Sequence, residues 1–219
     1  MDDGSREEEF FKLQQFVDSL GCGKRVKVFR RKENRGALLT KLECVEKCSS
    51  NWVLVLDSDN TAFRVYLDAL GKLDELDSKV FYCAGLAWPW FPFEELGLNP
   101  IDFQRAVKLC RDGRLRKFYI INDGNYLVNR IAYQKAVEKI GELPSDVVDV
   151  MIVNYLWLSQ GGSLQILPRK SYYHRVDASS FYKTTEDDSK HRLLEIFNRF
   201  QDGRTWSPDF LENLRQNCF

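Results

Sequence analysis

The feature that most constrains the fold is an apolar stretch that ends abruptly in a pair of aspartates. Residues 52–56 read Trp-Val-Leu-Val-Leu, and Asp57, Ser58, Asp59 and Asn60 follow directly. A short, uninterrupted apolar run is typical of a central strand that is covered by helices on both faces of its sheet. Because α/β sheets bind ligands at the carboxyl ends of their strands, we expect both carboxylates at a binding edge.

The patterns on either side of this strand predict a layered α/β domain. Helical spacing of apolar residues in some segments alternates along the chain with short extended runs in others. This alternation favours helices packed on a largely parallel sheet. The predicted helices span residues 5–20, 37–48, 61–70, 101–110, 131–140, 146–159, 190–200 and 208–216, and the predicted strands span residues 25–29, 52–56, 79–83, 118–121, 126–129, 164–167 and 171–176.

The aspartate pair has two physical interpretations. Two carboxylates held together repel each other, and one of them protonates unless a cation neutralises the pair. A hard divalent cation such as manganese or magnesium suits oxygen ligands and leaves coordination positions open for phosphates. Alternatively, Asp59 caps the helix that begins near residue 61 and Asp57 is solvated in a turn. The pair alone favours neither interpretation.

Composition narrows the class of protein. Lysine plus arginine number 32, as do aspartate plus glutamate, so the net charge gives no reason to expect nucleic-acid binding. No apolar run approaches the ~20 residues that span a bilayer, so we expect no transmembrane segment. The six cysteines form no C-x-x-C pair and only two histidines are present, which favours free thiols in a reducing compartment over structural zinc. The expected location is the cytoplasm, either free or at the periphery of a membrane.

Short motifs occur in a fixed order along the chain. They are Asp2-Asp3-Gly4-Ser5, Asn34-Arg35-Gly36, residues 52–60, 122–130, 140–143 and 146–161, and Tyr173-His174 with Ser179-Ser180. With this ordered set the chain resembles the family-2 glycosyltransferases, which have the GT-A fold, and the resemblance extends to about residue 182. It implies a three-layer α/β/α domain with a mixed, mostly parallel sheet and a helical C-terminal tail.

The resemblance assigns a nucleotide site to the first half of the chain. It implies that Asp3 hydrogen-bonds the nucleobase, with uracil expected, and that Asn34 and Lys41 lie near the nucleoside. Asp57 is expected close to the ribose or the metal. The donor is accordingly a nucleoside-diphosphate sugar, expected to be a UDP-sugar.

The resemblance also implies a metal site around the acidic pair. Asp59 is expected to be the principal ligand, holding the metal against the diphosphate, with Asp57 beside it. His174 is expected to contact the metal or the diphosphate. Without the resemblance to the family, the favoured interpretation is an ordinary half-buried histidine in a strand. The cofactor is therefore manganese or magnesium, which stabilises charge on the leaving nucleoside diphosphate.

An inverting transferase needs a general base for the acceptor hydroxyl, and two aspartates are candidates. Asp146 and Asp149 stand at i and i+3 on one face of a predicted helix. The family usually has Glu-Asp here and an arginine further along, where this chain has Asn154. Counting back from the glycines that close the helix favours Asp149. The alternative is that both carboxylates only cap the helix.

The acceptor side is marked by an aromatic segment near residues 88–93. Trp88 and Trp90 are candidates for a platform on which a sugar ring of a glycan acceptor stacks. A surface hydrophobic plug explains the same residues equally well.

The resemblance predicts a single domain over residues 1–219. Residues 1–75 form its nucleotide and metal half, 76–182 its acceptor half and 183–219 a helical tail. The family has a β-α-β unit before Asp-Asp-Gly-Ser, whereas Met1 precedes Asp2 here. We favour a shortened or fragmentary member of the family, in which the apolar edge of strand 52–56 is exposed. The alternative is that Asp2 to Ser5 match by chance and that the sheet is built differently.

The leading hypothesis is a metal-dependent, inverting transfer of a sugar from a UDP-sugar to a glycan hydroxyl, an activity used in polysaccharide biosynthesis. The alternative is a non-catalytic nucleotide- or glycan-binding remnant of the family. A nucleotidyltransferase that makes the activated sugar is disfavoured because the sequence has no Gly-rich, basic loop after its first strand.

Overall fold

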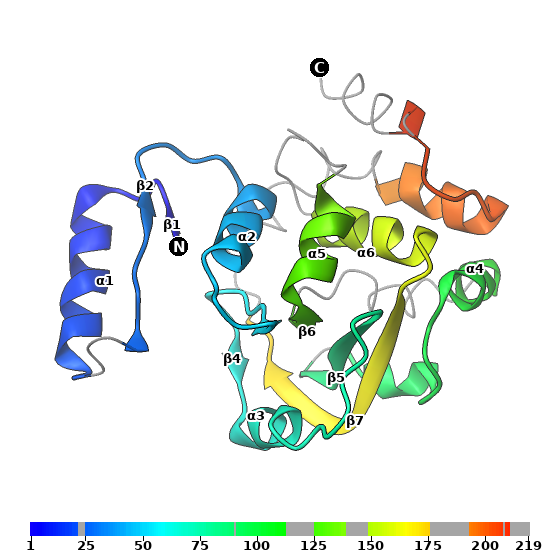
Figure 1. The fold of residues 1–219 in the computed structure, drawn as a ribbon, viewed down its shortest axis with the longest axis horizontal. Helices are drawn as coiled ribbons and strands as arrows, with labels where there is room; N and C mark the ends of the chain where they lie inside the picture. The colour runs from blue at the N-terminus through cyan, green and yellow to red at the C-terminus, as the bar shows by residue number, and fades with distance from the viewer. Residues whose placement is uncertain are drawn as a thin grey trace.

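The computed structural model describes residues 1–21, 25–89, 91–112, 125–138, 149–175, 193–207 and 209–210, and Figure 1 shows how the elements are arranged. Residues 193–202 are also helical. In chain order the named elements are β1 (Asp2–Asp3), α1 (Glu7–Ser19), β2 (Arg30–Arg31), α2 (Ala37–Glu46), β3 (Trp52–Leu54), β4 (Thr61–Ala62), α3 (Arg64–Leu70), β5 (Val80–Trp88), a 3₁₀ turn (Phe93–Leu96), α4 (Phe103–Arg111), β6 (Tyr126–Asn129), α5 (Arg130–Val137), α6 (Asp149–Ser159) and β7 (Ser163–Tyr173).

The main sheet has five strands in the order β3-β6-β5-β7-β4. The long strands β5 and β7 run parallel, whereas β6 is antiparallel to both β3 and β5, and β4 is antiparallel to β7. The predicted α/β class and mixed sheet are confirmed. The expectation of a mostly parallel sheet is wrong for the described strands, because an apolar pattern reports burial and does not report strand direction.

Strand β3, which the apolar pattern predicted to be central, lies at an edge of the described sheet. Among the described strands, β3 pairs only with β6. Its residues Trp52, Val53 and Leu54 are half-buried, and Leu56 just beyond it is 38% exposed. The predicted apolar edge is therefore present, although the strand is not covered on both sides.

A small second sheet lies apart from the main one. Strand β1 pairs in parallel with β2, so that Asp2 is opposite Arg30 and Asp3 is opposite Arg31. Figure 1 shows this pair and α1 on one side of α2, with α5 and α6 on the other side. Helix α1 buries no residue of its own, and helix α2 contacts both β1 of the small sheet and the helices α5 and α6.

The core forms where β5 and β6 meet α5 and α6. Every residue from 150 to 158 of α6 is buried, as expected for a very apolar helix. The ring of Phe81 stacks on Trp157 with centroids 4.2 Å apart, and it also lies 5.9 Å from the rings of Tyr126 and Tyr133. These aromatic contacts fix α6 against the sheet.

The C-terminal helical segment joins this core through aromatic rings. Phe200 lies 5.7 Å from Phe103 of α4 and 5.1 Å from Tyr155 of α6, measured between ring centroids. Phe210 lies 5.1 Å from Tyr155 in the same way. The expected helical tail is thus confirmed for residues 193–202.

Several predicted boundaries differ from the structure. The two strands predicted at 164–167 and 171–176 form the single strand β7, and the strand predicted at 25–29 is replaced by β2, two residues long. The helix predicted to begin at residue 61 starts at Arg64, because Thr61–Ala62 pairs with β7 instead. The strand predicted at 118–121 lies outside the described residues. Within the described part of the chain, no helix is both long enough and apolar enough to cross a membrane.

Four cysteines fall in the described residues, and all are free thiols, as the sequence predicted for them. Cys83 and Cys110 are buried, whereas Cys44 and Cys48 are half-buried on α2. Burial raises the pKa of the Cys110 thiol to about 12, so this thiol is not a reactive group.

Candidate functional site

The acidic turn follows β3 and is closed by its own backbone. Val55 N–H donates to the carbonyl of Tyr126 at 2.9 Å, which is the last backbone link to β6 before the turn. Asn60 N–H then donates to the carbonyl of Asp57 at 3.0 Å. Asp57 is half-buried and Asp59 is exposed, so the turn offers two carboxylates of different accessibility at the end of the strand.

The predicted nucleotide residues line one groove. The groove has a volume of about 750 Å³ and lies between the small sheet, α2 and the β3 edge. Asp3 and Asn34 come from the small sheet and its following turn, Lys41 from α2, and Asp57 from the acidic turn. Segments that are far apart in the sequence are therefore brought together along one groove.

Asp3 holds the turn that carries Asn34. Its carboxylate accepts N–H bonds from Arg35 at 3.0 Å, from Gly36 at 2.7 Å and from the guanidinium of Arg31 at 3.0 Å. Burial raises the pKa of Asp3, but the bonds from Arg35, Arg31, Thr40 and Gly36 outweigh it and leave the pKa below its ordinary value. Asp3 is thus ionised and fixes the shape of this wall of the groove.

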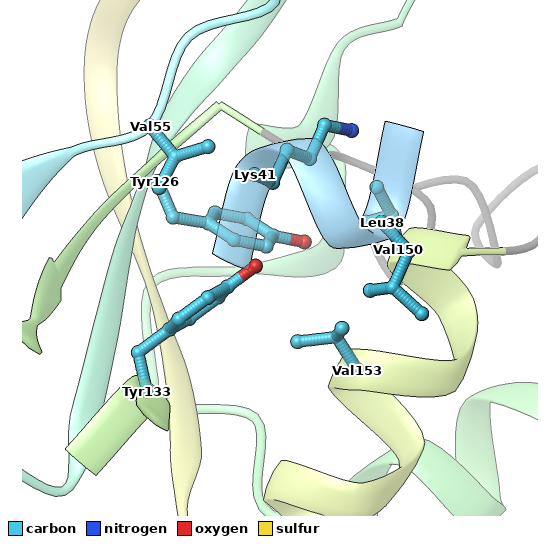
Figure 2. Close-up of a pocket in the computed structure, with 7 residues that line it drawn as sticks. All are labelled: Leu38, Lys41, Val55, Tyr126, Tyr133, Val150 and Val153. Atoms are coloured by element: carbon cyan, nitrogen blue, oxygen red, sulfur yellow. The ribbon is translucent and has the colours of Figure 1, made fainter. Parts of the chain in front are cut away.

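Lys41 lies between the groove and a small cavity. Its ammonium is 3.0 Å from a carboxylate oxygen of Asp57. Figure 2 shows the cavity beneath its side chain, with the hydroxyls of Tyr126 and Tyr133 directed toward each other. The cavity measures about 10 Å³, close to the lower limit for one water molecule. Its lining consists of Leu38, Lys41, Val55, Tyr126, Tyr133, Val150 and Val153.

His174 follows the end of β7 and lies within the electrostatic field of the acidic turn. Its backbone N–H donates to the carbonyl of Trp88 at 2.9 Å. Burial lowers the pKa of the imidazole, and the negative charges of Asp59 and Asp57 partly oppose this shift. The Nδ1 atom is buried and no described atom hydrogen-bonds to it. The lowered pKa favours the neutral form of the imidazole near pH 7, which is the form that can bind a metal.

The donor set fits a divalent cation only in part. Asp57 and Asp59 supply hard oxygen ligands, and the buried Nδ1 of His174 lacks a described partner. Among the described residues, no three His, Cys, Asp or Glu side chains gather closely enough to hold a metal ion by themselves. Oxygen atoms from a bound diphosphate would complete such a coordination shell, as magnesium and manganese sites commonly require.

Of the two general-base candidates, only the backbone of Asp149 lies in the described part of the chain, at the start of α6. Asp149 is the first residue of this helix, and its neighbour Val150 lines the cavity beneath Lys41. The backbone of Asp149 is thus brought near the Lys41 side of the groove. Asp146 and the side chain of Asp149 lie outside the described part of the structure. Asn154 is buried and donates from Nδ2 to the hydroxyl of Tyr126 at 2.7 Å, so it belongs to the core.

Of the two aromatic candidates for acceptor binding, Trp88 lies within the described residues. This residue ends β5, is 49% exposed, and its ring lies 5.6 Å from that of Tyr173. Since its carbonyl also accepts the bond from His174, the exposed indole lies beside the histidine segment. Trp90 lies outside the described residues.

Sequence reasoning missed two buried asparagines behind the acidic turn. Asn125 is 1% exposed and Asn60 is 8% exposed, and their side chains hydrogen-bond to each other at 3.2 Å. The available signal was a polar residue placed immediately before an apolar strand and another immediately after two aspartates. Such residues suggest a turn or a cap, and only the tertiary structure shows that they meet.

Comparison with known families bears on the first part of the chain. Residues 1–94 match the family model described as Glycosyl transferase family 2. A comparison with curated proteins gives no match. The matched segment includes Asp3, Asn34, Lys41, Asp57 and Asp59, which belong to the groove and to the acidic turn. Over residues 1–94, the chain is therefore similar to glycosyl transferase family 2.

Proposed function

We propose that the chain transfers a sugar from a UDP-sugar, or another nucleoside-diphosphate sugar, to a hydroxyl of a glycan acceptor. The match of residues 1–94 to the glycosyl transferase family 2 model supports glycosyl transfer in general. The finer proposal is a metal-dependent reaction with inversion at the sugar carbon. Its expected setting is polysaccharide biosynthesis in the cytoplasm or at a membrane surface.

The observation that carries this proposal is the convergence of four predicted residues on one groove. Asp3, Asn34, Lys41 and Asp57 line a space of about 750 Å³, which lies within the range of small-molecule sites. The exposed carboxylate of Asp59 belongs to the same turn as Asp57, and both charges act on His174. A nucleotide in the groove would therefore have its phosphates directed toward the acidic turn and the histidine.

The residues would divide the chemistry between them. Asp59, Asp57 and His174 would hold a manganese or magnesium ion, which when bound neutralises charge on the leaving diphosphate. Lys41 would add a positive charge beside the same phosphates. Asp149, with Asp146 as the second candidate, would accept the proton of the acceptor hydroxyl.

The remaining residues would bind the nucleoside of the donor and the sugar ring of the acceptor. Asp3 and Asn34 would orient the nucleobase and nucleoside, since they form the wall of the groove on the side of the small sheet. Trp88 and Trp90 would stack on a sugar ring of the acceptor. Trp88 suits this role because its indole is exposed next to the histidine segment.

A non-catalytic glycan-binding role is the second candidate, and one observation favours it. The carboxylate of Asp3 already accepts three N–H bonds from the protein, so its capacity for a nucleobase is reduced. Sugar transfer or donor hydrolysis that disappears in Asp149→Asn would exclude this candidate. Glycan binding without nucleotide binding or turnover would support it.

The decisive experiment is calorimetric titration of the full chain with UDP in the presence and absence of Mn²⁺. We expect binding that depends on the metal and is lost in Asp59→Ala. Asp68→Ala is a matched control, because Asp68 is an exposed carboxylate on α3 that pairs with Arg64 at 3.7 Å. Absence of binding by the intact chain, or binding that Asp59→Ala leaves unchanged, would overturn the proposal.

A further inference from the structure

Two buried asparagines connect the acidic turn to the strands around it. The side-chain oxygen of Asn125 accepts the backbone N–H of Asp57 at 3.1 Å and the side-chain amide of Asn60 at 3.2 Å. The side-chain oxygen of Asn60 in turn accepts the backbone N–H of Arg175 at 3.2 Å. A continuous hydrogen-bonded path thus runs from the start of β6, through the turn, to the residue after His174.

The two asparagine side chains of this path are buried, so their hydrogen bonds hold the turn in one position. Asn125 and Asn60 are 1% and 8% exposed, so water cannot readily replace a lost partner. The oxygen of Asn125 has two lone pairs and uses them for the two N–H groups of the turn. Leaving such a donor unsatisfied in the interior is costly, and the turn would move to avoid it.

The strand behind the turn is itself anchored at the same residue. The hydroxyl of Tyr66 donates to the backbone carbonyl of Asn125 at 3.2 Å, and Tyr66 is fully buried on α3. Asn125 therefore has a fixed backbone as well as a fixed side chain. The turn takes its position from a rigid part of the domain and not from its own exposed residues.

We propose that Asn125 and Asn60 are positioning residues that hold Asp57, Asp59 and His174 in register for one metal–diphosphate site. This inference rests on the proposed function. Neither asparagine contacts the ligand: Asn125 acts through the backbone of Asp57, and Asn60 acts through the backbone of Arg175. Buried groups that orient ligands commonly change metal affinity by about 10- to 100-fold when they are removed.

The test compares variants that differ in one acceptor. Asn125→Ala removes the oxygen that binds both N–H groups, whereas Asn125→Asp keeps an oxygen in its place. With UDP present, we expect Asn125→Ala to weaken Mn²⁺ binding roughly 10-fold or more and Asn125→Asp to recover most of that loss. Mn²⁺ binding is followed by electron paramagnetic resonance, which also reports whether the geometry of the bound ion changes.

A control separates positioning from general stability. Asn129 lies at the end of the same strand and caps α5, where its side-chain oxygen accepts the N–H of Ala132 at 3.1 Å. Asn129→Ala is expected to lower the urea midpoint without changing Mn²⁺ affinity. Asn60→Ala gives a second measurement should Asn125→Ala fail to fold.

The outcomes distinguish this inference from the proposed function. Absence of Mn²⁺–UDP binding by the unmodified chain would overturn the proposed function and this inference with it. If the unmodified chain binds and both Asn125→Ala and Asn60→Ala bind equally well, the positioning role is overturned and the proposed function stands. Equal losses in Asn129→Ala and Asn125→Ala would also overturn the positioning role.

Discussion

The ammonium of Lys41 lies 3.0 Å from a carboxylate oxygen of Asp57 and joins helix α2 to the acidic turn. The two side chains are only 17% and 31% exposed, so the pair is shielded from solvent more than a surface ion pair. A positive charge is thus built into the place where a divalent cation and a diphosphate are proposed to bind. In the proposed site, Lys41 would compete with the metal for Asp57 and would pair with the phosphates.

The substitution Lys41→Gln separates these two effects. Without the ammonium, we expect Mn²⁺ alone to bind more tightly, because a competing positive charge beside Asp57 is gone. We expect UDP to bind more weakly, because a positive charge beside its phosphates is gone. Each change should be roughly fivefold, as for an interaction of ~1 kcal/mol. Calorimetric titrations with Mn²⁺ and with UDP measure the two affinities separately.

The control for this charge removal is Lys108→Gln, which removes an exposed lysine from α4. It should leave both affinities unchanged. Parallel losses of Mn²⁺ and UDP binding in Lys41→Gln would contradict the assigned competition.

Asp3→Asn tests the wall of the groove through its pH dependence. The pKa of Asp3 is lowered from its ordinary value of 3.8, so the native chain binds fewer protons there than the unfolded chain. The stabilisation by Asp3 is complete above about pH 4 and is lost as pH falls through the lower native pKa. We expect a reduced urea midpoint for Asp3→Asn at pH 7, and a difference from the unmodified chain that shrinks below about pH 4.

Asp68→Asn on the exposed face of α3 is the comparison for this series, and it should change the midpoint little at any pH. The urea midpoints of Asp3→Asn and of the unmodified chain could instead differ by a constant amount down to the lowest pH at which both fold. That result would show that Asp3 stabilises the chain without its charge.

Gly162→Ala tests the packing that fixes α6. A Cβ at this position would overlap the indole of Trp157, which stacks on Phe81 and donates to the carbonyl of Ser163 at 3.0 Å. The indole would have to move in a packed core, and we expect a loss of about 1–3 kcal/mol in the free energy of unfolding. Urea unfolding followed by tryptophan fluorescence measures it.

Gly71→Ala provides a glycine control. The backbone there is right-handed, with a φ of −69°, and a Cβ would lie 3.6 Å from its nearest neighbour. It should be neutral or stabilise by up to ~1 kcal/mol. Equal effects of the two substitutions would show that the Trp157 contact is not important.

Asp149→Asn tests the general base. We expect sugar transfer to fall at least ~100-fold, while the affinity for UDP and Mn²⁺ stays the same, because the carboxylate acts on the acceptor proton. Asp146→Asn is the paired variant, and its transfer rate should fall much less. A larger loss in Asp146→Asn would move the assignment to that residue, and a loss of UDP binding in Asp149→Asn would point to a different role.

The acidic turn shows which features of this region could be predicted from the sequence. Residues 52–56 predicted a strand ending in carboxylates, and the structure has β3 followed by the turn of Asp57 and Asp59. The uninterrupted apolar run of this segment, however, could not distinguish a central strand from an edge strand. The apolar pattern predicted a central strand, whereas the resemblance to the family predicted an exposed edge, and the fold decided for the edge. Apolar content reports how much water is excluded and not which neighbour excludes it.

The histidine and the two asparagines show the same limit at the scale of the site. The sequence singled out His174 through a motif, but nothing in it linked Asn125 to Asp57, which are 68 residues apart. A long-range hydrogen bond has no local pattern of its own, since it depends on which strands pair and in what register.

The sequence by itself determined the α/β class, the apolar helix α6 and the acidic turn after an apolar strand. These features follow from local periodicity and from motifs that are contiguous along the chain. Only the tertiary structure decided the direction and order of the strands, the ion pair of Lys41 with Asp57, and the burial of Asn60 and Asn125 behind the turn. The physical reason is that these features arise between segments far apart in the chain, where packing and hydrogen-bond satisfaction across the whole domain select one arrangement.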